Sequence, residues 1–365
     1  MISLRRGRVV SLDAARPGAL ELTVEIAGET SLALAYPDLT GRVAVGDTVL
    51  LNTTAVALGL GTGGFHIVVS VDGGQETDLG GSGRVMKVRY TPLQTAVATV
   101  EETHRDVIEA SAGLTGTPVV SAPLHSMLAH VAAGAKVAGA QKVAYVMTDR
   151  AALPGAFSKL VPQLREAELL DAVITSGQAF GGDLEAVSLW SALIAAKEIC
   201  GADVIVVADG PGNLGTDTKW GSSALYGGHV LNAAEALKGR PVAALRVSFA
   251  DQRERHRGVS HHSLTILKDV CTVEANVAVP TLEPPERHEV WAALRSAGLE
   301  KKHRLVEVLG WPAVRAIEER GIAVASMGRG LEDDPSFFLA AGGAGILAGR
   351  MAARSSKWKA DIPEL

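Results

Sequence analysis

The feature that most limits how this chain can fold is a series of short, uninterrupted apolar runs after residue 116. Stretches with helical periodicity separate the runs, which span residues 118–122, 142–148, 172–175, 204–208, 242–247 and 322–325. Strands that are apolar along their whole length are buried on both faces, as in a parallel sheet covered by helices. The sequence therefore predicts a mainly parallel, doubly wound, Rossmann-like α/β domain over residues 117–365.

Helix boundaries fit this alternation of strands and helices. A small polar residue at a helix start can accept hydrogen bonds from free backbone N–H groups, whereas glycine often marks the end. On these signals we expect helices from Asp183 to Gly201, from Ser222 or Ser223 to near Gly239, and from Asp334-Pro335 onward.

The N-terminal residues show a different pattern. Apolar and polar residues alternate with period two, most clearly over residues 21–26, and turn residues interrupt the alternation. This pattern predicts a small β-barrel-like domain over residues 1–90, with residues 91–116 as a connector. A small barrel can bind oligonucleotides through stacked aromatic side chains, but this segment offers only Tyr36, Phe65 and Tyr90. We expect it to act as a packing or lid module.

Charge and cysteine content exclude several classes of partner. The formal net charge of −5 and the pI near 6.1 give no positive field that would draw nucleic acid or an anionic membrane. No apolar run reaches the roughly 20 residues that span a bilayer. Cys200 and Cys271 are too few for a thiolate metal cluster and suit reduced thiols. We therefore expect a cytoplasmic protein with no nucleic-acid and no membrane partner.

A glycine-rich loop begins at Asp209, directly after the predicted strand 204–208. Glycine lets a backbone adopt positive φ and approach a ligand without a Cβ in the way. The loop residues expected to bind an anion or a nucleotide are Gly210, Gly212, Asn213, Gly215 and Thr216. A plain structural turn is the alternative interpretation.

The glycine spacing also has the form of a dinucleotide-binding loop, which must open directly into a helix. Here residues 216–220 come between Gly215 and the expected helix cap. The acidic residue at a spacing suited to a ribose, Glu235, falls inside the next predicted helix. A nucleotide-cofactor oxidoreductase stays an alternative, and the cofactor is left open.

Polar residues follow the predicted parallel strands at their carboxyl ends, where open α/β sheets bind ligands. They include His125 and Ser126, Thr148-Asp149-Arg150, Ser176-Gly177-Gln178, Asp209, and the segment from Ser248 to His262. Loops are polar in any protein, so each residue alone can be ordinary loop chemistry. Together they predict one shared cleft.

The segment 252–263 brings three arginines and three histidines next to a helix that Ser260 is expected to cap. A helix N-terminus disfavours the imidazolium, so His261 and His262 are expected to be neutral and able to act as base or electrophile. Neighbouring residues point about 100° apart on a helix, so one ring would meet the substrate and the other would support it. His125 is the expected partner. Alternatively, the arginines form a solvated face balanced by acidic neighbours.

The spacing of histidines does not predict a metal site. There is no H-x-x-x-H or H-E-x-x-H motif, and His125 and His130 fall on different faces of a helix. A site assembled from distant loops stays open.

Two features lie near the C-terminus. Arg329 stands between two glycines and could reach a carboxylate or phosphate of a ligand. The last helix carries glycines that form helices poorly and allow close packing against another helix or a second subunit, namely Gly342, Gly343, Gly345 and Gly349. We therefore expect a homo-oligomer, most simply a homodimer.

Four motifs occur together along the chain: MKVRYTPLQ at 86–94, DGPGNLGT at 209–216, GVSHHSLT at 258–265 and SMGRG at 326–330. With them the chain resembles an uncharacterised bacterial family, domain of unknown function 3866. The resemblance covers most of the chain and implies no activity, substrate or cofactor.

The residues favour an enzyme, either a hydrolase or a group transferase, acting on a small anionic or phosphorylated metabolite at the carboxyl ends of the strands. The glycine loop and Arg257 would hold the anion, His261 or His125 would move protons, and Asp209 would orient one histidine. His262 would support them, and the remaining expected ligand contacts are Ser126, Gln178, Ser260 and Arg329. The alternative is a non-catalytic small-molecule-binding or regulatory protein.

Overall fold

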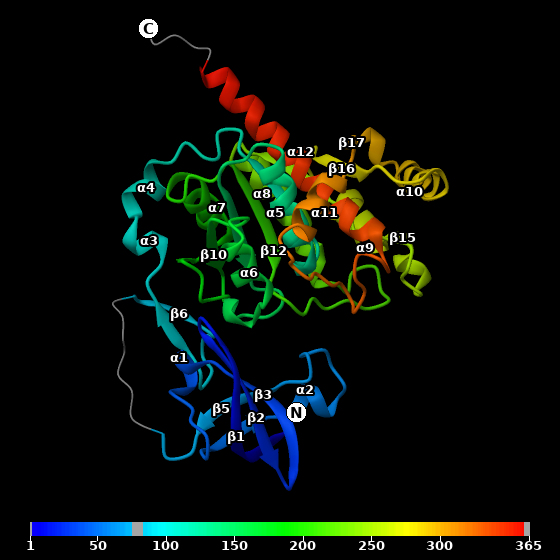
Figure 1. The fold of residues 1–365 in the computed structure, drawn as a ribbon. Coiled ribbons are helices and arrows are strands. Elements are labelled where there is room, and N and C mark those ends of the chain that lie inside the picture. Colours follow the sequence, from blue (N-terminus) through cyan, green and yellow to red (C-terminus); the bar gives the residue numbers. More distant parts are fainter. Residues whose placement is uncertain (1, 75–82, 361–365) are drawn as a thin grey trace. The chain divides into compact units, whose positions relative to one another are not determined.

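The structure is a computed structural model that describes residues 2–74 and 83–360, with side chains of the final helix described to residue 353. The chain divides into two compact units, Met1–Val97 and Ala98–Leu365 (Figure 1). The expected connector, residues 91–116, contains the last strand of the first unit and two short helices of the second.

The first unit is built on a closed five-stranded barrel with strand order β1-β2-β3-β5-β4. Its strands are β1 (Leu4–Arg16), β2 (Ala19–Ile26), β3 (Glu29–Ala35), β4 (Thr48–Asn52) and β5 (His66–Val71). Neighbouring strands are antiparallel except β3 and β5, which pair in parallel. The unit also holds α1 (Pro37–Thr40), α2 (Thr54–Ala57) and a hairpin of β6 (Val85–Lys87) and β7 (Thr95–Val97).

The period-two pattern explains the barrel core. In β2, the side chains of Leu22 and Val24 are fully buried, whereas that of Glu25, the next residue after Val24, is exposed. The predicted barrel is confirmed. Of the three aromatic side chains considered in the sequence, Tyr36 and Phe65 are buried, and Tyr90 is exposed in the turn between β6 and β7.

The second unit contains an eight-stranded sheet in the order β11-β10-β9-β12-β8-β13-β16-β17, and every neighbouring pair is parallel. The strands are β8 (Pro118–Ser121), β9 (Val143–Thr148), β10 (Ala172–Ser176), β11 (Leu184–Ala186), β12 (Val204–Asp209), β13 (Arg240–Ala244), β16 (Asn276–Pro280) and β17 (Arg304–Val308). The predicted Rossmann-like, doubly wound α/β architecture is confirmed. A small hairpin of β14 (Val247–Ser248) and β15 (Gly258–Val259) follows β13.

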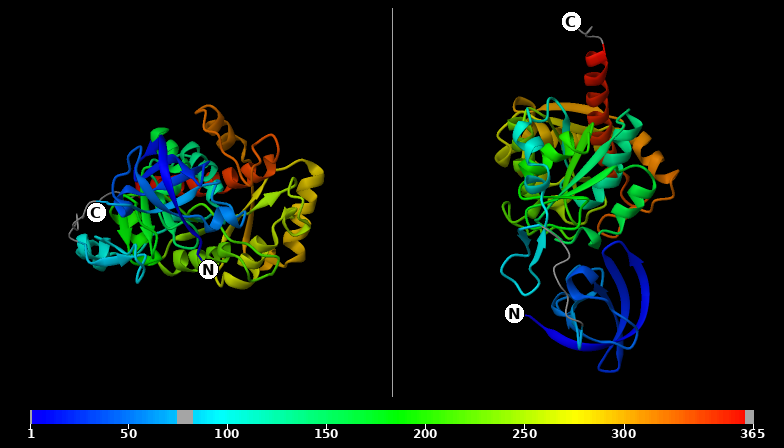
Figure 2. Two further views of the ribbon diagram at one scale, coloured as in Figure 1. Left: turned by 90° about the horizontal axis from the view of Figure 1, so that it is seen from below. Right: turned by 90° about the vertical axis from the view of Figure 1, so that its left-hand side faces the viewer.

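Helices cover both faces of this sheet (Figure 2). They are α3 (Val100–Thr103), α4 (Arg105–Ala110), α5 (Leu128–Val137), α6 (Leu160–Glu166), α7 (Leu189–Glu198), α8 (Tyr226–Ala236), α9 (His261–Thr265), α10 (Pro284–Ser296), α11 (Trp311–Glu318) and α12 (Pro335–Ala360). Alternate strand residues enter different cores: Val120 and Val206 pack with α5, α11 and α12, whereas Val119 and Val207 pack with α7 and α8. Burial on both faces explains why these strands are apolar throughout.

One predicted strand is wrong. Residues 322–325 form no strand; Ile322 and Val324 are apolar because they pack against the core beside α11. The sequence pattern missed β16 and the two edge strands, β11 and β17. The edge strand β17 was missed because it pairs with one neighbour only and therefore tolerates Arg304 and Glu307.

One predicted helix start is also wrong. Ser188 caps α7 by accepting a hydrogen bond from the Ser191 N–H, whereas Asp183 precedes β11. The Asp183 carboxylate accepts hydrogen bonds from Arg165 at 2.6 Å and from the Val173 N–H at 2.9 Å. The two other predicted starts are confirmed: Ser222 caps the turn that leads into α8, and Pro335 opens α12.

The glycines of α12 are explained by its packing against α5. A Cβ on Gly345 would overlap the Val131 carbonyl, and a Cβ on Gly349 would lie 2.5 Å from the Ala135 carbonyl oxygen. The expected close packing therefore occurs within the chain, and these glycines give no argument for a second subunit. Residues Pro335–Ala353 are long and apolar enough to cross a membrane, but 78% of that window is buried, as in a core helix of a soluble protein.

Candidate functional site

The topology of the sheet points to the carboxyl ends of β9 and β12. The chain leaves β9 through α6 on one face of the sheet, and it leaves β12 through α8 on the other face. Because these adjacent strands send their connections in opposite directions, a crevice is expected beyond their ends. Thr148 and Asp209, the last residues of the two strands, lie opposite each other in register.

Asp209 is buried at this point and holds the loop that follows it. Its carboxylate accepts hydrogen bonds from Thr148 Oγ1 at 2.5 Å and from Asn213 Nδ2 at 2.8 Å. Burial raises the pKa of Asp209, while hydrogen bonds from Thr148, the Arg150 backbone and Asn213 oppose that rise. The predicted catalytic residue Asp209 and the predicted ligand contact Asn213 are therefore brought together, with their polar groups directed at each other.

The glycine loop after Asp209 folds back on itself before the chain enters α8. A Cβ on Gly210 would lie 2.7 Å from the Ala152 carbonyl oxygen, so close packing explains this glycine, whereas Gly212 has a positive φ of 95° and open space around it. Gly215 forms an isolated bridge with Ser222, and Thr216 Oγ1 donates to the Gly221 carbonyl at 3.0 Å. No helix starts directly after Gly215, so the geometry of a dinucleotide-binding loop is not met.

The crevice itself is narrow. The cavity lined by Thr148, Asp209 and Tyr226 has a volume of about 10 Å³. That volume is about the space needed for one water molecule. A metabolite would therefore have to bind over the loops at this edge rather than deep between the strands.

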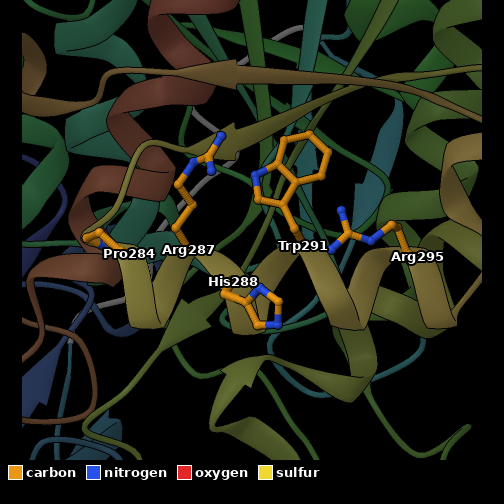
Figure 3. A pocket seen from close by; sticks show the side chains of 5 residues that line it. All are labelled: Pro284, Arg287, His288, Trp291 and Arg295. Atoms are coloured by element: carbon orange, nitrogen blue, oxygen red, sulfur yellow. The ribbon is translucent and has the colours of Figure 1, made fainter.

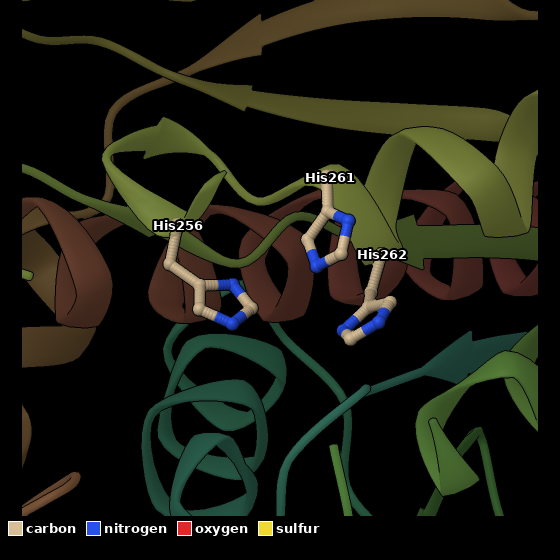
Figure 4. Close-up of side chains that lie close together, drawn as sticks. All are labelled: His256, His261 and His262. Atoms are coloured by element: carbon tan, nitrogen blue, oxygen red, sulfur yellow. The ribbon is translucent and has the colours of Figure 1, made fainter. Parts of the chain in front are cut away.

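A cluster of three histidines lies at the far end of the glycine loop. His256 comes from a short turn, Glu254–His256, and His261 and His262 begin α9 (Figure 4). One ring nitrogen from each histidine lies within 4.8 Å of those of the other two. The rings of His261 and His262 stack with centroids 3.8 Å apart. His256 was not among the predicted site residues, although it lies in the segment 252–263.

Hydrogen bonds fix two of these rings. Ser260 Oγ lies 2.8 Å from His256 Nδ1, so the Ser260 hydroxyl does not cap α9 as predicted. His262 Nε2 donates to the Thr218 carbonyl of the glycine loop at 3.3 Å. His261 Nε2 is buried and has no hydrogen-bond partner among the described residues.

The three rings are held neutral. Burial is the largest cause that lowers the pKa of each ring, and nearby arginines lower it further; the pKa of His256 falls to about 3. The neutrality matches the expectation from the sequence, but its cause is burial and the charge of the neighbouring arginines. At neutral pH each ring therefore keeps an unprotonated nitrogen.

A buried network of arginines and aspartates supports the cluster. Arg246 contacts His256 Nδ1 at 3.3 Å and binds Asp251 at 2.9 Å. Arg253 also binds Asp251, and its hydrogen bonds hold the pKa of that carboxyl well below the usual range. The predicted ligand contact Arg329 joins the same network through Asp251 and Asp334. Neither Arg246 nor Asp251 was predicted, because only the fold brings them to His256.

Arg257 has different surroundings from those predicted. Its guanidinium pairs with Glu289 of α10 at 2.9 Å and lies over the Phe249 ring. Arg255 instead faces the glycine loop: it pairs with Asp217 at 2.5 Å, and its Nε is buried without a hydrogen-bond partner in the described residues. Arg257, to which the sequence analysis assigned the anion, therefore faces Glu289, and Arg255 is the arginine that faces the loop.

His125 takes part in the core rather than in the histidine cluster. Its ring nitrogens contact Tyr145 Oη at 3.2 Å and Ser158 Oγ at 2.8 Å, and burial lowers its pKa to about 4. Tyr145 in turn donates to the Asp209 carbonyl at 2.9 Å. His125 thus braces the strand ends.

The two remaining predicted contacts are bound within the protein. Ser126 Oγ donates to Ser326 Oγ at 3.1 Å. The Gln178 N–H donates to the Asp149 carboxylate at 2.9 Å, in the loop after β10.

A separate hollow of about 540 Å³ runs along α10. It is lined by Pro284, Arg287, His288, Trp291 and Arg295, all on that helix (Figure 3). Arg287 is engaged with Glu307 at 2.7 Å. A hollow along one helix, without converging groups from other elements, offers no catalytic arrangement.

The sequence profile of a family described as a protein of unknown function (DUF3866) matches residues 32–345. The match spans most of the chain, so the chain belongs to this family. No curated protein matches the chain.

Proposed function

We propose that the protein is an enzyme, a hydrolase or group transferase, acting on a small anionic or phosphorylated metabolite. The substrate would bind at the carboxyl edge of the sheet, between the glycine loop and the histidine cluster. We expect this activity in the cytoplasm.

The observation that carries the proposal is the state of His261. Its ring is half-buried and neutral, and Nε2 has no hydrogen-bond partner in the described part of the chain. A buried polar atom without a partner is costly in a folded protein and is a common feature of functional sites. A neutral imidazole can accept a proton from a water or hydroxyl nucleophile.

Positive charge lies next to this base. Arg255 pairs with the exposed Asp217, and its buried Nε has no hydrogen-bond partner within residues 2–74 and 83–360. A guanidinium binds a phosphate or a carboxylate through charge-assisted hydrogen bonds, which are stronger than the hydrogen bonds it makes to a neutral group. We assign anion binding to Arg255 and to the loop around Gly212 and Thr216, in place of Arg257.

The alternative, a binding protein without turnover, is favoured by the narrowness of the crevice beside Asp209. In that case the same loops would hold a metabolite unchanged. Prolonged incubation with the ligand distinguishes the two functions, because only the enzyme consumes it.

The test is a turnover screen of the full chain on phosphomonoesters, pyrophosphates, thioesters and carboxylate esters. If His261 is the base, His261→Ala should lower kcat by about 10²- to 10⁴-fold. His288→Ala, an exposed histidine on α10, is the matched control and should keep wild-type turnover. Equal turnover of His261→Ala and wild type would contradict the proposed role, and silence of the wild type on the whole panel would favour the binding protein.

A further inference from the structure

We propose that His256, His261 and His262 form a binding site for one divalent transition-metal ion of the zinc class. The proposal goes beyond the proposed function, and it changes one role there: with an ion on His261 Nε2, that nitrogen would hold the metal instead of accepting a proton, and water at the open coordination position would serve as the base. It starts from the convergence of three ring nitrogens within 4.8 Å of one another (Figure 4).

The spacing is close to that of a metal site. Zinc binds histidine nitrogen at about 2.0–2.1 Å, so nitrogens around a tetrahedral ion lie about 3.4 Å apart. The rings would have to move inward by about 1 Å to reach that geometry. His261 is half-buried, and in the part of the chain that the structure describes no hydrogen bond to its Nε2 opposes the movement.

Each ring has one nitrogen that the protein does not use. His262 gives Nε2 to the Thr218 carbonyl, which leaves Nδ1. His256 has Nδ1 beside Ser260 Oγ at 2.8 Å and Arg246 Nη1 at 3.3 Å; metal binding through its Nε2 would require the ring proton on Nδ1, donated to Ser260, with Arg246 turned away. His261 has Nε2 free of partners in the described residues. Metal-binding histidines usually direct their second nitrogen at a carbonyl or hydroxyl in this manner, which fixes the ring and its tautomer.

The positive charge of the arginines around the rings is partly offset by carboxylates. Arg246, Arg253 and Arg329 share Asp251, and Arg255 is paired with Asp217.

The donor set decides the class of ion. Three imidazoles suit zinc, copper, iron or nickel, whereas magnesium and calcium prefer oxygen ligands. Three protein ligands leave a coordination position open, as in catalytic zinc sites. The H-x-x-x-x-H-H spacing was overlooked because two ligands come from α9 and one from the preceding turn.

The test is calorimetric titration of the chelator-treated full chain with zinc chloride, followed by visible absorption after loading with cobalt(II). We expect one zinc per chain and the intense visible bands of four-coordinate cobalt. His261→Ala should bind zinc at least about 100-fold more weakly, because loss of a mere supporting contact already costs 10- to 100-fold. Ser260→Ala, which keeps all three rings, should weaken binding by about 10-fold. His288→Ala should bind as wild type does.

Absence of stoichiometric binding by the wild type, or equal affinity of the wild type and His261→Ala, would overturn the metal site. Circular dichroism checks that His261→Ala is folded. If it is not, the zinc affinity of Ser260→Ala and the visible spectrum of the cobalt-loaded wild type test the metal site instead. Zinc binding without turnover would contradict the proposed enzyme and leave the metal site standing. Turnover by a protein that fails to bind zinc would do the reverse.

Discussion

The two ends of the glycine loop after β12 differ in how fully their polar groups are satisfied. At the Asp209 end, the carboxylate receives hydrogen bonds from Thr148 and Asn213. At the histidine end, His261 Nε2 and Arg255 Nε are buried without partners among the described residues. Buried polar groups that are hydrogen-bonded to each other stabilise the fold. Buried polar groups without a partner in the protein can instead form hydrogen bonds to a ligand. We therefore assign structure to the first end and function to the second.

The largest effect on stability is expected at Asp209. Asp209→Ala would leave the buried Thr148 hydroxyl without its acceptor, whereas the half-buried Asn213 amide would keep Ser223 Oγ at 3.2 Å. A buried, unpaired group costs about 1–3 kcal/mol, so the free energy of unfolding, measured by urea denaturation, should fall by about 2 kcal/mol. His261→Ala should lower it by less than about 1 kcal/mol. A larger loss of unfolding free energy in His261→Ala than in Asp209→Ala would contradict the assignment of structure to the Asp209 end.

The Asp209 end should also show a pH dependence through His125. The folded-state pKa of His125 is lowered to about 4, against 6.5 for the free side chain, because the ring is buried. The unfolded chain then binds more protons between these values, so stability is full above pH 6.5 and is lost as the pH falls toward 4. The loss should reach about 3 kcal/mol at most.

Urea denaturation at pH 7, 6 and 5 measures this loss, with His125→Asn as the comparison. The variant should show a shallower dependence on pH, because it cannot take up the proton. An unchanged slope in the variant would show that His125 is not the group responsible.

Two glycines of the same loop should differ in their tolerance of a side chain. Gly210→Ala places a Cβ 2.7 Å from both the Ala152 carbonyl oxygen and Met147 Cε, and overpacking of this kind costs about 2 kcal/mol. At Gly215 the new Cβ would only touch His262 Cε1 at 3.7 Å, so the change should stay within about 0.5 kcal/mol. Melting temperatures of the two variants compare the two ends of the loop directly.

The smallest effect is expected at Arg257. Its pair with Glu289 is about half exposed on both sides, and such pairs contribute about 0.5 kcal/mol or less. Arg257→Ala should therefore change neither stability nor turnover measurably, in contrast to Arg255→Met. A loss of anion binding in Arg257→Ala would restore the role that the sequence suggested for this residue.

The sequence predicted the central strands and the barrel well, because burial leaves a local pattern. Strands β8, β9, β10 and β12 are apolar on both faces, and β2 alternates between core and solvent. The edge strand β17 was missed because only one side of it pairs, which permits charged residues.

The candidate site could be predicted only in part. The loop after Asp209 and the pair His261 and His262 were found because strand, glycine and histidine are local signals. The partners of Arg257 and His125 were not, because Glu289 and Tyr145 are brought to them only by the fold. Arg246 beside His256 was missed for the same reason.

The most direct test of the central claim is the melting temperature of the full chain against phosphate, pyrophosphate and small carboxylates, with Arg255→Met and His125→Asn as the variants. A ligand at a hundredfold excess over its Kd adds about 2.7 kcal/mol, which corresponds to a rise of several degrees. We predict this rise for at least one anion in the wild type, its loss in Arg255→Met, and its retention in His125→Asn despite a lower starting melting temperature. An equal rise in Arg255→Met and the wild type, or none with any anion, would contradict the account.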